Sequence, residues 1–510
     1  MSSTAEKQRD NEGLLAINAA LETENSELKY QVDKLNHELK LLRIARFGQK
    51  SERFNPDQLD LFADAELPPI EAPPEEEAEK EEITYTRKKP KRRNLQEISA
   101  SGKYPTEQVI HDIDEKDKQC GECDKALSVI GDDKTYMLDR IPAQIKIVEH
   151  VKLKYACKCC EGNVKMAKLP KFPIAKSIAM PSLLAYTLVA KYCDHLPLYR
   201  QAAMWQREGF DINRSTLSSW VIKLDKVCSP LIPHLQECIL NGLYCQADES
   251  PIQVLNEKDR KNTQKSYMWV FKGGPPDKQS VVFKYHPTRA GFVAQDFLKG
   301  FKGYVQSDGY AGYNFVAADK YMYQLYCMAH ARRKFMEVVK LTKKKGLAHE
   351  VIKMIKELYK IEREARKKGL NPDEIYALRQ EKSKPIMDKL KVWLDEHIQT
   401  ILPKSPTGKA MGYMLKHWEG LYRYLKSGYV EIDNNGIENM IRPLALGRKN
   451  YLFMGSPTGA DAAANIYSLL ATCKANNINP YKYFKKMLEN IRYCETEDDY
   501  RQLLPQNIVL

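Results

Sequence analysis

The sequence lacks any apolar run that approaches the roughly 18 to 20 residues needed for a transmembrane helix. Its first ten residues are polar, with no apolar stretch behind a basic cluster, so a secretory signal is not expected. A repeat of solenoid period is also missing. These absences argue against a membrane span and predict a reducing cytoplasm, where the 12 cysteines would be thiols or metal ligands.

The 510 residues carry 80 Lys and Arg against 67 Asp and Glu, which gives a formal net charge of +13 at pH 7. At roughly 150 residues per domain, this length predicts about three or four units and at least one sizeable core. The basic balance favours a polyanionic partner, although many ordinary enzymes share it. Local motifs must therefore identify the partner.

A heptad pattern marks residues 11–46. Leucines recur at seven-residue steps, and the positions three before the later leucines hold Asn18, Asn25, Val32 and Leu39. This pattern is typical of a coiled-coil seam, in which asparagines favour a parallel pair in fixed register. We expect a leucine zipper that pairs two copies of the chain, with a helix packed on its own chain as the alternative. The leucines are Leu14, Leu21, Leu28, Leu35 and Leu42.

Residues 64–94 change from a Pro- and Glu-rich stretch to a basic one that ends in Arg87-Lys-Lys-Pro-Lys-Arg-Arg93. Prolines and like charges keep such a segment from burying enough apolar surface to fold, which predicts a disordered linker. The basic run can contact phosphate or remain a solvated tail.

Two Cys-x-x-Cys pairs lie within residues 104–172, and Cys159 is a spare thiol beside the second pair. Four thiolates in two such pairs suit a closed tetrahedral zinc site, which is structural rather than catalytic. The residues between the pairs have the character of strands, especially residues 144–155. We predict a small zinc ribbon, against the alternative of four unrelated core cysteines. The predicted ligands are Cys120, Cys123, Cys157 and Cys160.

Helical patterns fill residues 178–240 and are interrupted before Asn213-Arg-Ser-Thr-Leu-Ser-Ser-Trp220, where Asn213 or Ser215 can cap a new helix. This arrangement resembles a helix-turn-helix, whose second helix can enter a major groove while nearby cations meet phosphates. A helical connector that only packs is the alternative. The candidate phosphate contacts are Arg200, Arg207, Arg214 and Lys223.

Residues 241–455 contain short β-rich runs, and helical stretches follow the third, fourth and fifth of them. Three strands followed by alternating helices and strands fit an α/β sheet of the ribonuclease-H type. The runs cover residues 243–247, 267–272, 280–285, 303–306 and 324–326.

Acidic residues follow two of these strands, Asp248 after the first and Asp308 after the fourth. A third, Glu438, lies one turn into a helix that Asp433 or Asn434 can cap. Three carboxylates from separate elements can hold two hard cations, Mg²⁺ or Mn²⁺, for in-line phosphoryl displacement. Ordinary surface carboxylates are the alternative.

Several long motifs occur in order along the chain. They are Phe47-Gly-Gln-Lys-Ser-Glu52, the paired cysteines, Leu196-Pro-Leu-Tyr-Arg200, Ala247-Asp-Glu-Ser-Pro251, Ser307-Asp-Gly-Tyr-Ala-Gly-Tyr313, Cys327-Met-Ala-His-Ala-Arg-Arg-Lys-Phe335, Asn434-Asn-Gly-Ile-Glu438 and Arg442-Pro-Leu-Ala-Leu-Gly-Arg-Lys-Asn450. With them the chain resembles the transposases of the insertion-sequence 66 family. The resemblance implies a DDE recombinase with Asp248, Asp308 and Glu438 on the catalytic positions, and a helical insertion at about residues 344–429.

The family usually carries Asp-Glu-Thr-Pro where this chain has Asp248-Glu-Ser-Pro251, which keeps the carboxylate and a hydroxyl. Glu249 is the rival ligand to Asp248, but adjacent side chains on a strand face opposite ways, so only one can face the metals. We choose Asp248.

His330 follows the fifth strand, where it can orient water or a phosphate in catalysis or simply pack. Cys327-x-x-His330 is half of a metal-site pattern without a second half nearby in the sequence. Basic residues near His330 and Glu438 can contact the DNA backbone or be solvated. They are Arg332, Arg333, Arg442, Arg448 and Lys449.

Together these patterns predict a multidomain α/β DNA transposase with a zipper, a linker, a zinc ribbon, a helical DNA-binding segment, a catalytic core and a helical tail over residues 456–510. Two Mg²⁺ ions would activate water to cut the transposon ends, and the freed 3′ hydroxyl would attack target DNA. The expected partners are double-stranded DNA, further copies of the chain in a homodimer or higher oligomer through the zipper, and accessory transposition proteins, in the cytoplasm at the nucleoid. The alternative is a non-catalytic, zinc-containing, dimeric DNA-binding protein descended from a transposase.

Overall fold

The computed structural model describes residues 145–155, 165–341 and 346–509. The chain divides into two compact units, and residues 170–509 belong to one while residues 145–155 and 165–169 belong to the other. The predicted zipper, the predicted linker and the four predicted zinc ligands lie outside the described residues.

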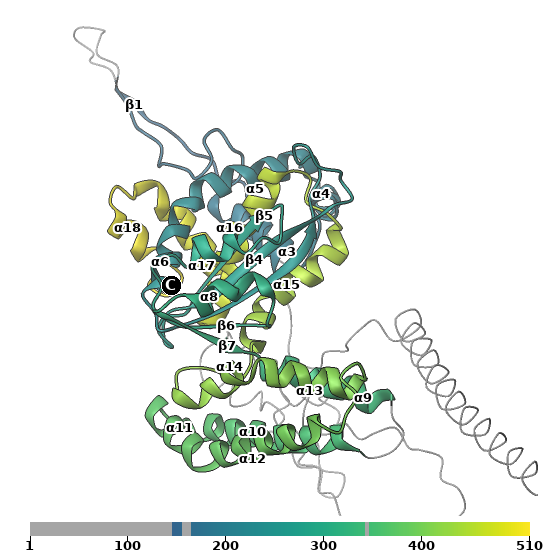
Figure 1. Ribbon diagram of the computed structural model, residues 1–510. Coiled ribbons are helices and arrows are strands. Elements are labelled where there is room, and N and C mark those ends of the chain that lie inside the picture. The colour runs from purple at the N-terminus through teal and green to yellow at the C-terminus, as the bar shows by residue number, and fades with distance from the viewer. Residues whose placement is uncertain (1–144, 156–164, 342–345, 510) are drawn as a thin grey trace, which may run out of the picture. The chain divides into compact units, whose positions relative to one another are not determined.

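A five-stranded sheet forms the centre of the larger unit (Figure 1). The strand order is β5-β4-β3-β6-β7, with β3, β4 and β5 antiparallel and with β6 and β7 parallel to β3. The predicted α/β class is therefore confirmed. The strands are β3 (Tyr244–Gln253), β4 (Lys265–Gly273), β5 (Ser280–His286), β6 (Gly303–Ser307) and β7 (Met322–Tyr326).

Helices precede, interrupt and follow this sheet. Within the described residues, the sheet is preceded by α3 (Pro181–Tyr192), α4 (Leu198–Arg207), α5 (Arg214–Cys228) and α6 (Ile232–Leu240). Short helices α7 (Phe292–Phe297) and α8 (Asn314–Ala318) follow β5 and β6, and the longer α9 (Met328–Leu341) follows β7. The last four are α15 (Asn435–Tyr451), α16 (Pro457–Ala475), α17 (Pro480–Asn490) and α18 (Glu497–Gln502).

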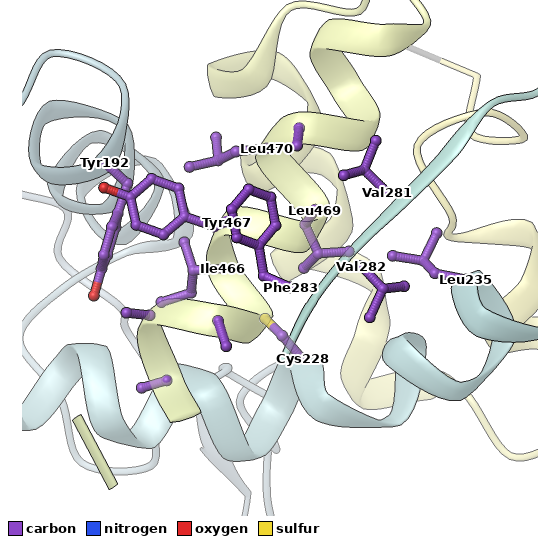
Figure 2. Packing of buried hydrophobic residues seen from close by; sticks show 14 of the residues in the cluster. Tyr192, Cys228, Leu235, Val281, Val282, Phe283, Ile466, Tyr467, Leu469 and Leu470 are labelled. Carbon is purple, nitrogen blue, oxygen red and sulfur yellow. The ribbon is translucent and has the colours of Figure 1, made fainter. Parts of the chain in front are cut away.

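One hydrophobic core joins the sheet to helices from both ends of this unit. Leu235 of α6, Phe283 of β5 and Leu469 of α16 belong to the same buried cluster (Figure 2). Apolar β-branched and aromatic residues, such as those of Trp269-Val-Phe271, fill the strands because both faces are covered. The segments that the sequence separated at residues 240 and 455 therefore share a core and do not form domains of their own.

Helix α16 covers the outer edge of β5 with side-chain hydrogen bonds. The Val281 amide donates to the Thr472 hydroxyl over 3.0 Å, and the Phe283 amide donates to the Ser468 hydroxyl over 2.8 Å. Asn476, one turn further on, exchanges two bonds with the backbone of Gln279. Because these residues recur every fourth position, one helix face satisfies a strand edge that would otherwise be free to pair with another chain.

We expect Thr472→Val, which keeps the shape but removes the hydroxyl, to lower the free energy of unfolding by about 1 to 3 kcal/mol, because the buried Val281 amide loses its acceptor. Thr472→Ser retains the hydroxyl and is the matched control. Urea unfolding measures the difference, and equal stabilities of the Val and Ser variants would contradict the role of this bond.

In a second core, α9 and Leu325 of β7 pack with the helices that lie between α9 and α15. They are α10 (Leu347–Lys368), α11 (Pro372–Leu378), α12 (Lys384–Ile398), α13 (Pro406–Lys416) and α14 (Trp418–Tyr422), with a π-helical turn at Arg379–Ser383. Within this core Arg379 is 2% exposed, and its guanidinium donates two hydrogen bonds to the Glu362 carboxylate, at 2.8 and 2.7 Å. Its third nitrogen donates to the carbonyls of Tyr424 and Ser427.

In the smaller unit, β1 (Lys154–Tyr155) pairs antiparallel with β2 (Lys165–Met166). The strand expected over residues 144–155 is therefore wrong for residues 145–153, which have no regular structure. Within the described residues, no helix is both long and apolar enough to cross a membrane.

Candidate active site

Asp248 lies in the middle of β3, opposite Val270 of β4, so the prediction that it follows the end of the strand is wrong. The first half of β3 pairs with β6 only through residue 246, while β4 continues along its other edge to residue 253. Beyond Gln246, β6 no longer pairs with this edge of β3, and the start of α15 contacts the edge instead. Asp248 therefore stands where one neighbouring strand ends and a helix begins to cover the sheet.

Asp308 directly follows β6, as the sequence indicated. Its carboxylate accepts the Tyr310 amide over 2.8 Å, and its carbonyl accepts the Tyr413 hydroxyl of α13 over 2.8 Å. Gly309 between them has φ +91°, a left-handed conformation that strains residues with a side chain. These contacts fix a tight turn that holds Asp308 at the carboxyl end of β6.

Glu438 lies in the first turn of α15. The start of this helix is tied to β3, because the Asn434 amide group donates to the Ala247 carbonyl and the Gln246 amide group donates to the Asp433 carbonyl, both over 3.1 Å. The Asp433 carboxylate accepts the Asn435 amide over 3.0 Å, whereas the Asn434 side chain makes no cap. The two residues just before Asp248 thus anchor the helix that carries Glu438.

Asp308 and Glu438 both act electrostatically on Asp248. Burial raises the pKa of Asp248 well above its usual range, and the charges of Glu249, Asp308 and Glu438 raise it further. All three residues are half-buried, and like charges that act on one another in a partly buried site are costly unless cations neutralise them. The donor set therefore fits hard divalent cations, which prefer carboxylate oxygens.

We expect the affinity for Mn²⁺ to rise with pH, because Asp248 must lose its proton before it can bind a cation. Without metal, the pKa of Asp248 is higher in the folded chain than in the unfolded chain, so the protonated carboxyl favours folding. The free energy of unfolding should therefore fall as the pH rises from the unfolded pKa to the folded pKa. Calorimetric titration with Mn²⁺ at several pH values, in buffers of different ionisation enthalpy, would show proton release. An affinity independent of pH in the wild type would contradict this expectation.

His330, in the first turn of α9, faces the same site. Its Nδ1 lies 3.9 Å from the Glu438 carboxylate and has no hydrogen-bond partner within the described part of the chain. Burial lowers the pKa of His330, and the charge of Arg333 lowers it further. In the described ranges, the one group of three possible ligands within 4.8 Å of one another is Cys327, His330 and Glu438. The Cys327 thiol, however, accepts the Asn434 amide, and burial raises its pKa well above the usual range.

Comparison with known proteins decides the family. Residues 176–462, more than half of the chain, match the model described as "Transposase IS66 family". This chain belongs to that family. The "zinc-finger binding domain of transposase IS66" matches residues 117–161, the "IS66 C-terminal element" matches residues 468–506, and "Transposase C of IS166 homeodomain" matches residues 34–99.

Two relatives from Sinorhizobium fredii (strain NBRC 101917 / NGR234) are similar over most of their length. The uncharacterized protein y4jD is 32% identical, with 78% of this chain and 79% of the relative covered. The uncharacterized protein y4hP is 31% identical, with 91% of this chain and 85% of the relative covered. The zinc-finger match contains the four predicted cysteine ligands and supports a structural zinc.

Two of the basic residues predicted to bind DNA in this IS66 transposase have other contacts. Arg332 is 8% exposed, and burial lowers its pKa while the nearby Tyr359 of α10 raises it, so little of this side chain is accessible to DNA. Arg448 donates to the Ser250 hydroxyl over 3.1 Å and to the Pro251 carbonyl, which ties α15 to β3. Arg333 and Lys449 are exposed, and Arg442 is half-buried.

In the helical segment before the sheet, α5 has an exposed face that carries basic residues. The Asn213 side chain caps this helix by accepting the Thr216 amide over 2.9 Å. Leu217, Trp220 and Leu224 bury the opposite face. A shallow hollow on the exposed side is lined by Arg214, Ser215, Ser218, Ser219, Ile222, Lys223 and Lys226. Arg200 and Arg207, on the preceding α4, are exposed as well.

Glu249, the rival of Asp248, is a buried acid with partners of its own, and the sequence did not predict its arginine partner. Glu249 has a side chain only 1% exposed, and it pairs with Arg289, which lies between β5 and α7. It also accepts the Tyr313 hydroxyl over 2.9 Å. Its neighbour Asp248 does not share these partners. The alternation of side chains along β3 explains this division.

Proposed function

We propose that this IS66 transposase cuts DNA at the ends of an insertion sequence and joins the freed ends to target DNA, with Asp248, Asp308 and Glu438 holding two Mg²⁺ ions. Mn²⁺ would serve as well. The observation that carries the proposal is that Asp308 in the turn after β6 and Glu438 on α15 both lie near enough to Asp248 of β3 to raise its pKa. The strand order, with three antiparallel strands followed by two parallel ones, supports a ribonuclease-H-type core.

When bound, the two cations would stabilise the attacking and leaving oxygens of an in-line displacement at phosphorus. The chain's own part is to fix the ligands. The Gly309 turn holds Asp308, the Asn434 and Gln246 bonds hold the start of α15, and the sheet holds Asp248. This rigidity keeps water or a 3′ hydroxyl in line with the scissile bond.

His330 would take part next to Glu438. Since burial and neighbouring cations lower its pKa, the imidazole is neutral at physiological pH. A neutral ring can accept a proton from the attacking water or orient it through Nδ1. We propose this role for His330.

DNA binding would use the exposed face of α5. Its first turns carry Arg214, Ser215 and Ser218, which are short enough or flexible enough to reach base edges in a major groove. Lys223 and Lys226 further along the helix, with Arg200 and Arg207 on α4, would contact phosphates. Arg333, Arg442 and Lys449 would continue this contact near the carboxylates.

Joining two ends in one event requires two active sites, and the predicted zipper over residues 11–46 would pair them in a homodimer. The zinc ribbon and linker would lie between this pairing device and the rest of the chain. Accessory transposition proteins are further proposed partners.

The test is incubation of the full chain with duplexes that carry the terminal sequences flanking its own coding region. We expect strand cleavage that requires Mg²⁺ or Mn²⁺ and joining of cut ends to a second duplex. Tight, specific binding without cleavage under any divalent cation would favour the alternative, a non-catalytic DNA-binding protein.

A further inference from the structure

Arg289 is held rigidly beside the proposed site by contacts on two sides. Its Nε donates to the Glu249 carboxylate over 2.6 Å, and its Nη2 contacts the same oxygen. Its guanidinium stacks on the Tyr310 ring, 3.9 Å from the ring centroid. The Tyr310 hydroxyl in turn donates to the Arg289 carbonyl over 2.6 Å. Main chain and side chain of Arg289 are therefore both fixed.

This fixed cation still faces solvent. The Arg289 side chain is 41% exposed although its carboxylate partner is 1% exposed. A guanidinium has five N–H donors, and the Glu249 contacts engage only the Nε and Nη2 side of the group. The remaining side can therefore donate outward in the geometry that matches a phosphate.

Arg289 also lies next to the turn of Asp308. The Tyr310 residue on which it stacks donates its amide to the Asp308 carboxylate, and the Asp308 charge acts on Arg289. DNA that approaches three carboxylates meets their negative charge. A rigid guanidinium at this edge offers an attractive contact for the backbone just where that repulsion is felt.

We propose that Arg289 is a phosphate-binding residue that holds one backbone phosphodiester of the DNA substrate beside Asp308, with Glu249, Tyr310 and Tyr313 as the residues that position it. The inference rests on the proposed function, because it names a contact to the same DNA. Glu249, the rejected metal ligand, thereby has a role of its own. Arginine suits this task better than lysine because its planar group can pair with Glu249, stack on Tyr310 and bind phosphate together.

The structure offers a matched control at the β3–β4 connection. Glu257 has a side chain 4% exposed and accepts the Arg260 Nε over 2.9 Å, the Ser266 hydroxyl over 2.5 Å and the Tyr285 hydroxyl. Like Glu249, it is a buried glutamate paired with one arginine and one tyrosine. Arg260→Gln therefore removes the same kind of ion pair away from Asp308.

The experiment measures binding of the full chain, in Ca²⁺, to terminal-sequence duplexes that carry a single neutral methylphosphonate at successive positions around the cleavage point. In wild type, we expect one position near that point to weaken binding at least about tenfold, the loss of one charged hydrogen-bond contact. Arg289→Gln should weaken binding of unmodified DNA by a similar factor. In this variant the methylphosphonate at that one position should have no further effect on binding, whereas the other positions should keep their wild-type effects. The slope of log affinity against log salt concentration should become shallower by about one for this variant, because one phosphate contact is lost.

Arg260→Gln should keep the wild-type pattern at every position. Because Arg289→Gln leaves Glu249 buried without its cation, the double variant Glu249→Gln/Arg289→Gln is measured as well, and it should show the same selective insensitivity. If both variants keep the full wild-type sensitivity at every position, Arg289 only neutralises Glu249 and the proposal is overturned. The two proposals fail in different measurements. Unchanged methylphosphonate sensitivity would overturn only the Arg289 contact, and absence of metal-dependent cleavage by the wild type would count only against the proposed function.

Discussion

Asp308→Asn should reduce strand cleavage by at least about a thousandfold, because the amide is a poor ligand for the hard cations whose charge stabilisation amounts to several kcal/mol. The amide oxygen can still accept the Tyr310 amide, so the turn after β6 should keep its shape. Binding of the terminal duplex should be unchanged within about twofold, since the basic contacts remain. Cleavage of labelled duplex in Mg²⁺ and binding in Ca²⁺ measure the two effects.

Asp319 provides the control for this change. Its carboxylate accepts the amide of the residue two positions on, Tyr321, over 2.7 Å, as Asp308 does with Tyr310 over 2.8 Å. Asp319 is exposed and lies at the far end of the β6–β7 connection. Asp319→Asn should therefore leave cleavage unaffected. Equal activity of the Asp308 variant and this control would remove Asp308 from the site.

Arg379→Met should destabilise the helical insertion by about 3 to 5 kcal/mol, because it leaves the Glu362 carboxylate buried without its cation and two backbone carbonyls without a donor. Met fills most of the volume, so the loss would come chiefly from charge and hydrogen bonding. Thermal unfolding, followed by hydrogen exchange in α10 and α12, measures the effect.

Arg366→Met on the same helix α10 is the control. The Arg366–Glu431 pair is 55% and 44% exposed, so removing it should cost no more than about 1 kcal/mol. If the Arg379 variant were as stable as the Arg366 variant, the buried pair would not be what holds the π-helical turn against α10. Restoring stability with Glu362→Met in the Arg379→Met background would support the account, because no buried charge is then left alone.

The sequence predicted Asp308 and Glu438 in their correct local settings but misjudged the strand that carries Asp248. The predicted strand over residues 243–247 stops before Pro251, which has no N–H to donate to a ladder. In the structure, β3 has lost its β6 neighbour by this point, so the missing N–H has no ladder bond to make. The Pro251 carbonyl instead accepts Arg448 from α15. Only the tertiary arrangement shows that β3 continues.

Other features depended on contacts between residues far apart in the sequence. Arg289 lies in a short turn without a recognisable motif, and its role follows only from Glu249, 40 positions earlier. Arg332 was grouped with Arg333, yet helical geometry turns adjacent residues to different faces, and one of them enters the core. Ser468 and Thr472 gave no sign that α16 caps the β5 edge, since hydroxyls in a helix commonly bond to its own backbone.

The most direct measurement of the central claim is anomalous diffraction from crystals of the full chain with terminal DNA and Mn²⁺. The account predicts two manganese ions roughly 3.5 to 4 Å apart, with ligands from Asp248, Asp308 and Glu438. It would be contradicted by manganese bound only to the Cys327, His330 and Glu438 group, or by any of the three carboxylates lying outside the metal shell with DNA in place.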